Sequence, residues 1–342
     1  MEQRTEIADL GEFALIHHLT KNIELTNAST VLGVGDDAAV IDHFGKQTVI
    51  TTDLLLEGIH FDLMYTPLKH LGYKAVVVNL SDIYAMNAIP TQITVSIGIS
   101  NRFSVEALSE FYEGVYFACE KYGVDLIGGD TSSSLKGFVI SVTAIGEVTP
   151  NQFVKRSTAQ KGDLICVSGD LGGAFLGLTL MEREKKIYQE NPKVQPDLEN
   201  ESYIVGRLLK PEARKDIIEF FVANNIVPTA MMDVSDGVSS EVLHLCKESG
   251  IGCRIYEDKL PIADLSRQAA YKFNLDPTVC ALNGGEDYEL IFTLKPEDHD
   301  KIVLNEEISV IGYTTYLEEG VKLLTKGGNT FDITAQGWNA FQ

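Results

Sequence analysis

Positive charge is scarce in this sequence of 342 residues. It has 28 lysine and arginine residues against 49 aspartate and glutamate residues, which gives a formal net charge of -21. Nucleic acids and anionic membrane surfaces would repel such a chain overall, so we expect neither as a partner. Long apolar runs are missing as well. Nowhere do 18 apolar residues stand together, and the sequence predicts no transmembrane helix.

The cysteines form no C-x-x-C motif and no pairing with histidine at the spacing of a zinc site. There are five of them, namely Cys119, Cys166, Cys246, Cys253 and Cys280. Scattered cysteines of this kind are typical of reduced thiols, mostly in the core of a cytosolic protein. Residues 1–19 combine mixed charge with an amphipathic helical pattern and lack the apolar centre of a signal peptide. We therefore expect a cytoplasmic protein.

Common nucleotide-binding loops are absent or weakly matched. No Walker A loop occurs, so any nucleotide must be held without one. Residues 33–38, GVGDDA, formally match G-x-G-x-x-A, and Asp53 lies near the distance of a ribose-binding acid, so a Rossmann oxidoreductase is one alternative. Against it, Asp36 and Asp37 stand where a pyrophosphate needs bare amides, and the segment that follows predicts a hairpin instead of a helix. A second glycine loop, GDLGGAFLG at 169–177, is better explained by a tight turn and close helix packing than by an anion site.

The length of the chain exceeds what one hydrophobic core usually serves, so we expect two domains, residues 1–149 and 150–342. Apolar alternation predicts strands at 47–52, 91–99, 138–148, 164–168, 252–256 and 288–294, and helical spacing predicts helices at 68–88, 105–122, 213–224 and 239–249. The polar segment 184–202 predicts a long loop. Strands and helices mix without a strict βαβα rhythm, which favours an α+β fold over a doubly wound sheet.

Six segments place carboxylates beside glycine, serine or threonine at the end of an apolar run. Their polar residues are Asp36 and Asp37; Thr51, Thr52 and Asp53; Asp82; Asp130; Asp233, Ser235 and Asp236; and Glu286 and Asp287. Any one of these motifs alone is more often a structural turn or a helix cap. Asp82 resists that interpretation, because it lies in a helix-like stretch among valine, leucine and isoleucine, where a carboxylate needs a partner.

If these carboxylates converge, cations must lie between them. The candidate ligands are all oxygens, which selects hard ions such as Mg²⁺, Mn²⁺ or Ca²⁺. A calcium-binding module without catalytic activity is an alternative, but DVSDG at 233–237 has its glycine at the fifth position and lacks the spacing of an EF-hand. Because Mg²⁺ takes only one or two carboxylates and fills its octahedron with water and phosphate, many scattered aspartates indicate several Mg²⁺ ions on a polyphosphate.

With these motifs in order, the chain resembles the thiamine-monophosphate kinase family, within the aminoimidazole-ribonucleotide-synthetase-like superfamily. The matching blocks are GEFALI from Gly11, GVGDDAAV, TTDLLLEGIHF, LGYKAVVVNLSDIYAM, IGGDTSSS, VKRS, MMDVSDGVSSE, NGGEDYELIF and the GW that ends at Trp338. These blocks cover nearly the whole chain, and they differ from the signature blocks of the superfamily member that acts in purine synthesis. Where relatives often read AMGADP, this chain reads AMNAIP, with Asn87 in place of glycine, and it has KPEAR at 210–214 in place of RPxPR.

The resemblance implies ATP-dependent phosphorylation of thiamine monophosphate to thiamine diphosphate, assisted by several Mg²⁺ ions, with a sibling ATP-dependent synthetase as the alternative. It implies metal ligation by Asp37, Thr51, Thr52, Asp53, Asp82, Asp130, Asp233 and Asp236. It implies ATP contacts from Gly129, Asp130, Arg156 and Ser235, and substrate contacts from His60, Glu286 and Trp338. Direct phosphoryl transfer needs charge neutralisation and in-line positioning, so no covalent nucleophile is expected. A homodimer whose N-terminal domains pair into a shared β-barrel is also implied.

Overall fold

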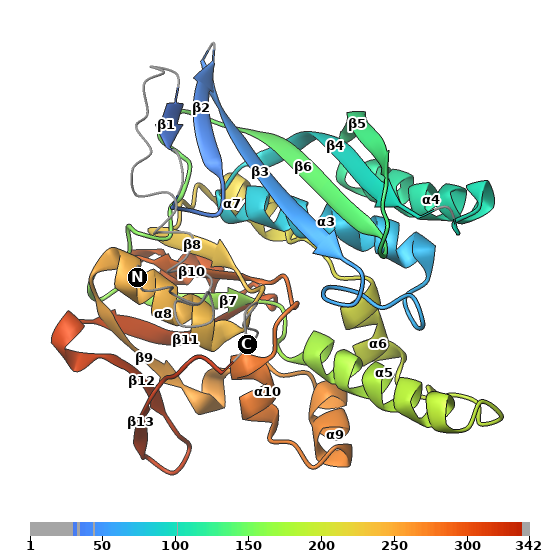
Figure 1. Cartoon of the computed structure of the whole chain (residues 1–342). Helices are drawn as coiled ribbons and strands as arrows, with labels where there is room; N and C mark the ends of the chain where they lie inside the picture. Colours follow the sequence, from blue (N-terminus) through green and yellow to red (C-terminus); the bar gives the residue numbers. More distant parts are fainter. Residues whose placement is uncertain (1–29, 33–34, 44, 101, 337–342) are drawn as a thin grey trace, which may run out of the picture.

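The computed structural model describes residues 30–32, 35–43, 45–100 and 102–336, which form two β-sheets with helices packed against them (Figure 1). Trp338, the block at Gly11 and the amphipathic pattern at 1–19 lie outside the described residues. Among the described helices, none combines the length and the apolar character needed to cross a membrane.

The first sheet has six strands in the order β1-β2-β3-β6-β4-β5. Its strands are β1 (Thr30–Leu32), β2 (Ala39–His43), β3 (Lys46–Leu56), β4 (Ile89–Ile99), β5 (Asp125–Ser133) and β6 (Val139–Val148). β2 and β3 form the predicted antiparallel hairpin, and only the β4–β5 pair of this sheet is parallel. The long helices α3 (Leu68–Ala85) and α4 (Val105–Tyr122) lie on one face of the sheet (Figure 1). Along β6 buried and half-buried residues alternate strictly, because one face packs on the helices and the other does not.

Two glycines let α3 and α4 cross closely. A Cβ atom on Gly72 would lie 1.9 Å from the carbonyl oxygen of Phe111, and a Cβ atom on Gly114 would lie 1.9 Å from that of Lys69. Any side chain at either position would therefore force the helices apart. This crossing fixes α3, the helix that carries Asp82.

The second sheet has seven strands in the order β13-β12-β9-β11-β7-β10-β8. They are β7 (Leu164–Ser168), β8 (Ala230–Asp233), β9 (Gly252–Tyr256), β10 (Leu290–Leu294), β11 (Ile308–Thr315), β12 (Val321–Leu324) and β13 (Thr330–Asp332). Only the β9–β12 pair is parallel, so neither sheet has the parallel arrangement of a Rossmann fold. The mixed α and β architecture agrees with the predicted α+β class.

The remaining helices belong to the second half of the chain. They are α5 (Gly173–Glu190), α6 (Ser202–Leu209), α7 (Lys215–Asn224), α8 (Val238–Ser249), α9 (Asp264–Lys272), α10 (Pro277–Asn283) and α11 (His299–Ile302), with short 3-10 turns η1 (Glu257–Lys259), η2 (Pro296–Asp298) and η3 (Leu317–Glu319). The prediction of a loop over 184–202 was wrong in its first part, because α5 continues to Glu190. Most polar residues of 184–190 lie on the exposed side of α5. Glu184 is the buried exception, and it accepts a hydrogen bond from the Asp197 amide at 2.9 Å.

The replacement of glycine by Asn87 keeps the turn after α3. Its φ of 57° is in the left-handed region, which asparagine tolerates better than most residues. Its side-chain amide donates to the carbonyl oxygen of Gln152 at 2.9 Å. The departure therefore preserves the backbone beside the candidate site.

Candidate functional site

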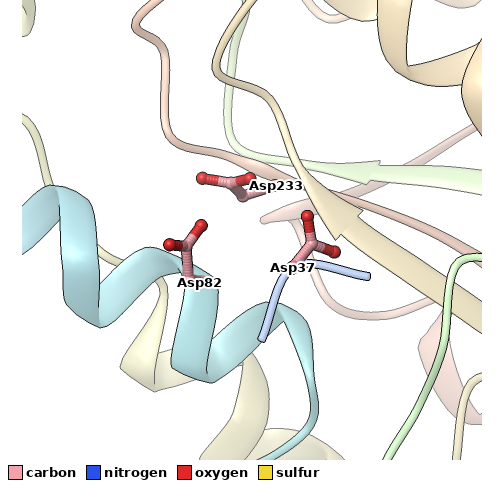
Figure 2. A group of neighbouring side chains, drawn as sticks. All are labelled: Asp37, Asp82 and Asp233. Atoms are coloured by element: carbon pink, nitrogen blue, oxygen red, sulfur yellow. The ribbon is translucent and has the colours of Figure 1, made fainter. Parts of the chain in front are cut away.

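Three of the predicted carboxylates meet where α3, which packs on the first sheet, contacts β8 of the second sheet. Oxygen atoms of Asp37, Asp82 and Asp233 all lie within 4.8 Å of one another. Asp37 precedes the hairpin of the first sheet, Asp82 lies on α3, and Asp233 ends β8 of the second sheet; Figure 2 shows their carboxylates turned toward one another. The cluster therefore draws on both halves of the chain.

Hydroxyl groups hold two members of the cluster in place. Thr51 donates to Oδ2 of Asp82 at 2.7 Å, and the buried Ser81 donates to Oδ2 of Asp233 at 2.8 Å. Ser81 and Asp82 are neighbours on α3, so one helical turn supplies both a carboxylate and the donor for the carboxylate opposite. Two hydroxyls do not neutralise three carboxylates, and the site retains strong negative potential.

Burial and mutual repulsion disfavour the ionised form of the carboxylates in this cluster. Burial, followed by the charges of Asp53, Asp233 and Asp37, raises the pKa of Asp82 well above its ordinary value. Burial likewise raises the pKa of Asp37, although the guanidinium of Arg156 opposes this change. Burial and the Asp233 charge raise the pKa of Asp53 from 3.8 to about 6. Oδ2 of Asp37 is buried and has no hydrogen-bond partner among the described residues, which fits an oxygen that ligates a metal ion.

The double aspartate has divided roles around Arg156. Asp36 accepts hydrogen bonds from the Arg156 amide at 3.2 and 3.3 Å and from its Nε at 3.3 Å. A second nitrogen of the same guanidinium pairs with Oδ1 of Asp37. Asp36 thus holds the backbone and side chain of Arg156, while Asp37 pairs with Arg156 through Oδ1 and leaves Oδ2 free of hydrogen bonds from the described residues.

The three residues Thr51, Thr52 and Asp53 of β3 do not all face the cluster. Side chains alternate along a strand, so Thr51 and Asp53 share the face toward α3, where the Asn79 side chain accepts a hydrogen bond from the Asp53 amide at 2.9 Å. Thr52 is exposed and donates to the Val142 carbonyl oxygen at 3.0 Å. The structure therefore brings Thr51 and Asp53 to the cluster and turns the Thr52 hydroxyl away from it.

Gly129 and Asp130 lie at the far edge of the first sheet. They belong to β5, which β4 and β6 separate from β3, so about 14 Å of sheet lies between them and Asp53 at the usual strand spacing. Asp130 is exposed. A Cβ atom on Gly129 would lie 1.8 Å from the Val95 carbonyl oxygen, so this glycine allows β5 to approach β4. Within one chain these two residues do not reach the cluster.

Ser235 and Asp236 form the turn that follows Asp233. Oε1 of Glu241 accepts hydrogen bonds from the amides of Ser235 at 3.1 Å and Asp236 at 2.8 Å, which fixes this turn at the beginning of α8. Glu241 is a buried carboxylate that the sequence interpretation missed. Its position on the first turn of a predicted helix could have indicated this capping role.

Glu286 sits on a strained segment that packs against the same turn. The φ angles of Glu286 and Tyr288 are 65° and 52°, and their amides donate to the carbonyl oxygens of Ser235 at 2.7 Å and Val234 at 2.9 Å. Left-handed backbone at two bulky residues is costly and is concentrated at functional sites. Between them, Asp287 accepts hydrogen bonds from the Gly172 and Ala174 amides, so a carboxylate of the chain itself caps the N-terminus of α5.

A buried lysine that sequence reasoning missed contacts Glu286. Nζ of Lys74 on α3 lies 2.9 Å from Oε2 of Glu286, and His60 is close enough that both charges shift its pKa. Burial is the main cause that lowers the pKa of His60, and its Nδ1 accepts the Leu56 amide hydrogen at 3.0 Å. The signal for Lys74 was present: like Asp82, it is a lone charge in an apolar stretch of one helix.

The family model "AIR synthase related protein, N-terminal domain" matches residues 35–148. A curated relative named thiamine-monophosphate kinase, from Aquifex aeolicus, is 34% identical over 335 residues, 98% of this chain and 99% of its own length. A second, from Bacillus subtilis, is 32% identical and covers 97% of this chain and 100% of its own. A solved structure described as AaThiL complexed with AMPPCP and TMP superposes with a TM-score of 0.83 at 32% identity, covering 98% and 99% of the two chains.

Proposed function

The chain belongs to the thiamine-monophosphate kinase family, and from this premise we propose that it transfers the terminal phosphoryl group of ATP directly to the phosphate of thiamine monophosphate, assisted by several Mg²⁺ ions. The observation that carries the proposal is the convergence of Asp37, Asp82 and Asp233 at the junction of the two sheets. Carboxylates gathered at one point suit the binding of metal-complexed polyphosphate better than they suit a nicotinamide or an anion alone.

Mg²⁺ fits the residues that are present. Asp37, Asp82 and Asp233 would hold it, with Asp53 beside them, and Oδ2 of Asp37, which no described residue hydrogen-bonds, offers a ligand oxygen. Bound Mg²⁺ neutralises phosphate charge and orients oxygens for in-line displacement. We retain Thr51, Thr52, Asp130 and Asp236 as further proposed ligands, of which Thr52 would have to use an atom other than its hydroxyl.

Protein groups around the cluster would place the two substrates. Arg156, held by Asp36, presents a planar guanidinium suited to a phosphate oxygen of ATP, and Ser235 lies in the adjoining turn. Glu286 and His60 lie beyond the cluster along α3, where they would contact the organic end of thiamine monophosphate; Trp338 is proposed to contact it as well. No side chain needs to act as a covalent nucleophile, because positioning and charge neutralisation suffice for this transfer.

We further propose domains at residues 1–149 and 150–342 and a homodimer in which the first sheets pair into a shared barrel. The chain leaves the first sheet after Val148 and enters the second at Leu164. On the sheet face opposite α3 and α4, the residues of β6 are only half-buried by the described part of the chain, and β5 is largely exposed. A dimer would also explain why Gly129 and Asp130, proposed to contact ATP, stand far from the cluster of their own chain.

To test the proposed kinase activity, the purified protein is incubated with ATP, MgCl₂ and thiamine monophosphate, and the products are separated by chromatography. Thiamine diphosphate and ADP in equal amounts are expected. The alternative is a sibling ATP-dependent synthetase of the same superfamily. Aminoimidazole ribonucleotide formed from its precursor, or ADP release without thiamine diphosphate, would contradict the kinase. Sedimentation equilibrium tests the dimer independently of activity.

A further inference from the structure

Lys74 has an unusual environment for a lysine. Its side chain is 5% exposed, and its ammonium group contacts two parts of the second half of the chain: Oε2 of Glu286 at 2.9 Å and the carbonyl oxygen of Leu208, in α6, at 3.3 Å. Burial of a lysine is costly unless the ammonium is paired. The chain therefore keeps a charge inside at a place where an apolar residue would pack more cheaply.

The position of Lys74 on α3 relates Glu286 to the acidic cluster. Lys74 and Ser81 are seven residues apart, so they lie on the same side of the helix, two turns or about 10 Å from each other. Ser81 contacts Asp233 in the cluster, and Lys74 contacts Glu286. One rigid helix thus fixes the separation between the cluster, where phosphate would bind, and the carboxylate that would meet the other end of the substrate.

The contact with Lys74 uses only one oxygen of Glu286. Lys74 holds Oε2, and the Glu286 side chain is 29% exposed, which leaves Oε1 available to a ligand. His60 lies nearby, and because its Nδ1 accepts a hydrogen bond, the neutral ring carries its proton on Nε2. An acceptor and a donor therefore stand together, which suits an aminopyrimidine ring bearing an exocyclic amine and ring nitrogens.

We infer that Lys74 is a positioning residue for the organic end of the substrate: it fixes the rotamer of Glu286 so that Oε1 accepts from the substrate amine. This inference rests on the proposed function and deepens it. Lys74 does not touch substrate; it acts through Glu286. Its removal should therefore weaken binding of thiamine monophosphate and leave ATP binding and the transfer step nearly unchanged.

Steady-state kinetics with each substrate varied in turn tests this inference. For Lys74→Met we expect KM for thiamine monophosphate to rise about tenfold or more, the loss of one charge-assisted hydrogen bond, with KM for ATP and kcat within about threefold of wild type. Lys74→Arg should recover part of the loss. The matched control is Lys69→Met, on the same helix, whose ammonium pairs with Glu113 at the surface and is 54% exposed; its KM values should equal those of wild type.

A double-mutant cycle separates positioning from general stabilisation. Glu286→Gln alone should raise KM for thiamine monophosphate, and adding Lys74→Met to it should raise KM no further, because the residue through which Lys74 acts is already disabled. The double variant replaces both members of the Lys74–Glu286 ion pair and leaves no charge unpaired, so we expect it to fold even if the single Lys74→Met variant does not.

Three results would overturn the inference: an unchanged KM for thiamine monophosphate in Lys74→Met, equal increases of KM for both substrates, or additive effects of the two substitutions. A wild-type protein that forms no thiamine diphosphate would instead contradict the proposed function itself, and this inference would fall with it. If the wild-type protein does form thiamine diphosphate and any of the three results is obtained, only the role of Lys74 is contradicted and the proposed function stands.

Discussion

Replacement of Asp82 by asparagine is expected to stabilise the metal-free protein and to remove most of its response to Mg²⁺. The oxygens of Asp82, Asp37 and Asp233 lie within 4.8 Å of one another. Two unit charges at that separation repel by about 3.5 kcal/mol at an effective dielectric constant of about 20. Asp82 faces two such neighbours, so full ionisation would cost up to about 7 kcal/mol, of which proton uptake relieves a large part, consistent with its raised pKa.

The asparagine side chain has the same shape and can still accept the hydrogen bond from Thr51, so the substitution removes the repulsion at little other cost. We expect a gain of about 1–3 kcal/mol in the free energy of unfolding at neutral pH without metal. At about 2–4 °C per kcal/mol, this gain raises Tm by several degrees. Millimolar MgCl₂ should raise Tm of the wild type, because the ion binds the folded state, and should raise that of the variant much less.

Scanning calorimetry in EDTA and then in MgCl₂ measures both effects. Asp300→Asn is the matched control, since the Asp300 carboxylate is fully exposed. This substitution should change neither Tm in EDTA nor the rise in Tm that MgCl₂ causes. A lower Tm for Asp82→Asn in EDTA, or a Mg²⁺-induced rise equal to that of wild type, would refute the reasoning. Either result would place Asp82 outside the metal site.

Three further predictions concern packing, pH and the nucleotide. Gly72→Ala should cost about 2–4 kcal/mol in urea unfolding, since its Cβ would lie 1.9 Å from the Phe111 carbonyl oxygen; wild-type stability would contradict the close helix crossing. Because the folded pKa of Asp53 is about 6 against 3.8, its stabilisation is complete below pH 3.8 and lost as pH rises through 6. In EDTA, the free energy of unfolding of Asp53→Asn should therefore rise by about 2–3 kcal/mol relative to that of wild type as pH increases from ~4 to ~7, and parallel pH profiles of the two proteins would contradict this. Asp36→Ala should raise Kd for ATP about tenfold by releasing Arg156; isothermal titration with a non-hydrolysable ATP analogue measures this change, and an unchanged Kd would count against the contact.

Most of the fold could be predicted from local patterns. The strand at 164–168 and the helix at 105–122 have the predicted bounds, because alternation or helical spacing is unbroken there and turn residues flank them. The segment 184–190 was missed, since a polar helix that exposes most of its side chains has the composition of a loop. The strand β5 was also missed, because its two glycines and exposed residues suggest a turn.

The sequence by itself determined which residues could bind a metal and why. A carboxylate at Asp82 within an apolar helix demands a partner wherever the helix lies, and oxygen-only candidates demand a hard cation. These conclusions depend on residue type and local spacing, which the chain carries without folding. They led to the family, to which the chain belongs over nearly its full length.

Only the tertiary structure decided which candidates meet. Strand alternation turns Thr52 away from the cluster, and sheet order places Asp130 at the opposite edge. The role of Asp36 and the contact of Lys74 with Glu286 join residues 120 and 212 positions apart. No local pattern encodes such pairs, because the packing of α3 between the two halves of the chain brings them together and burial makes their charges interdependent.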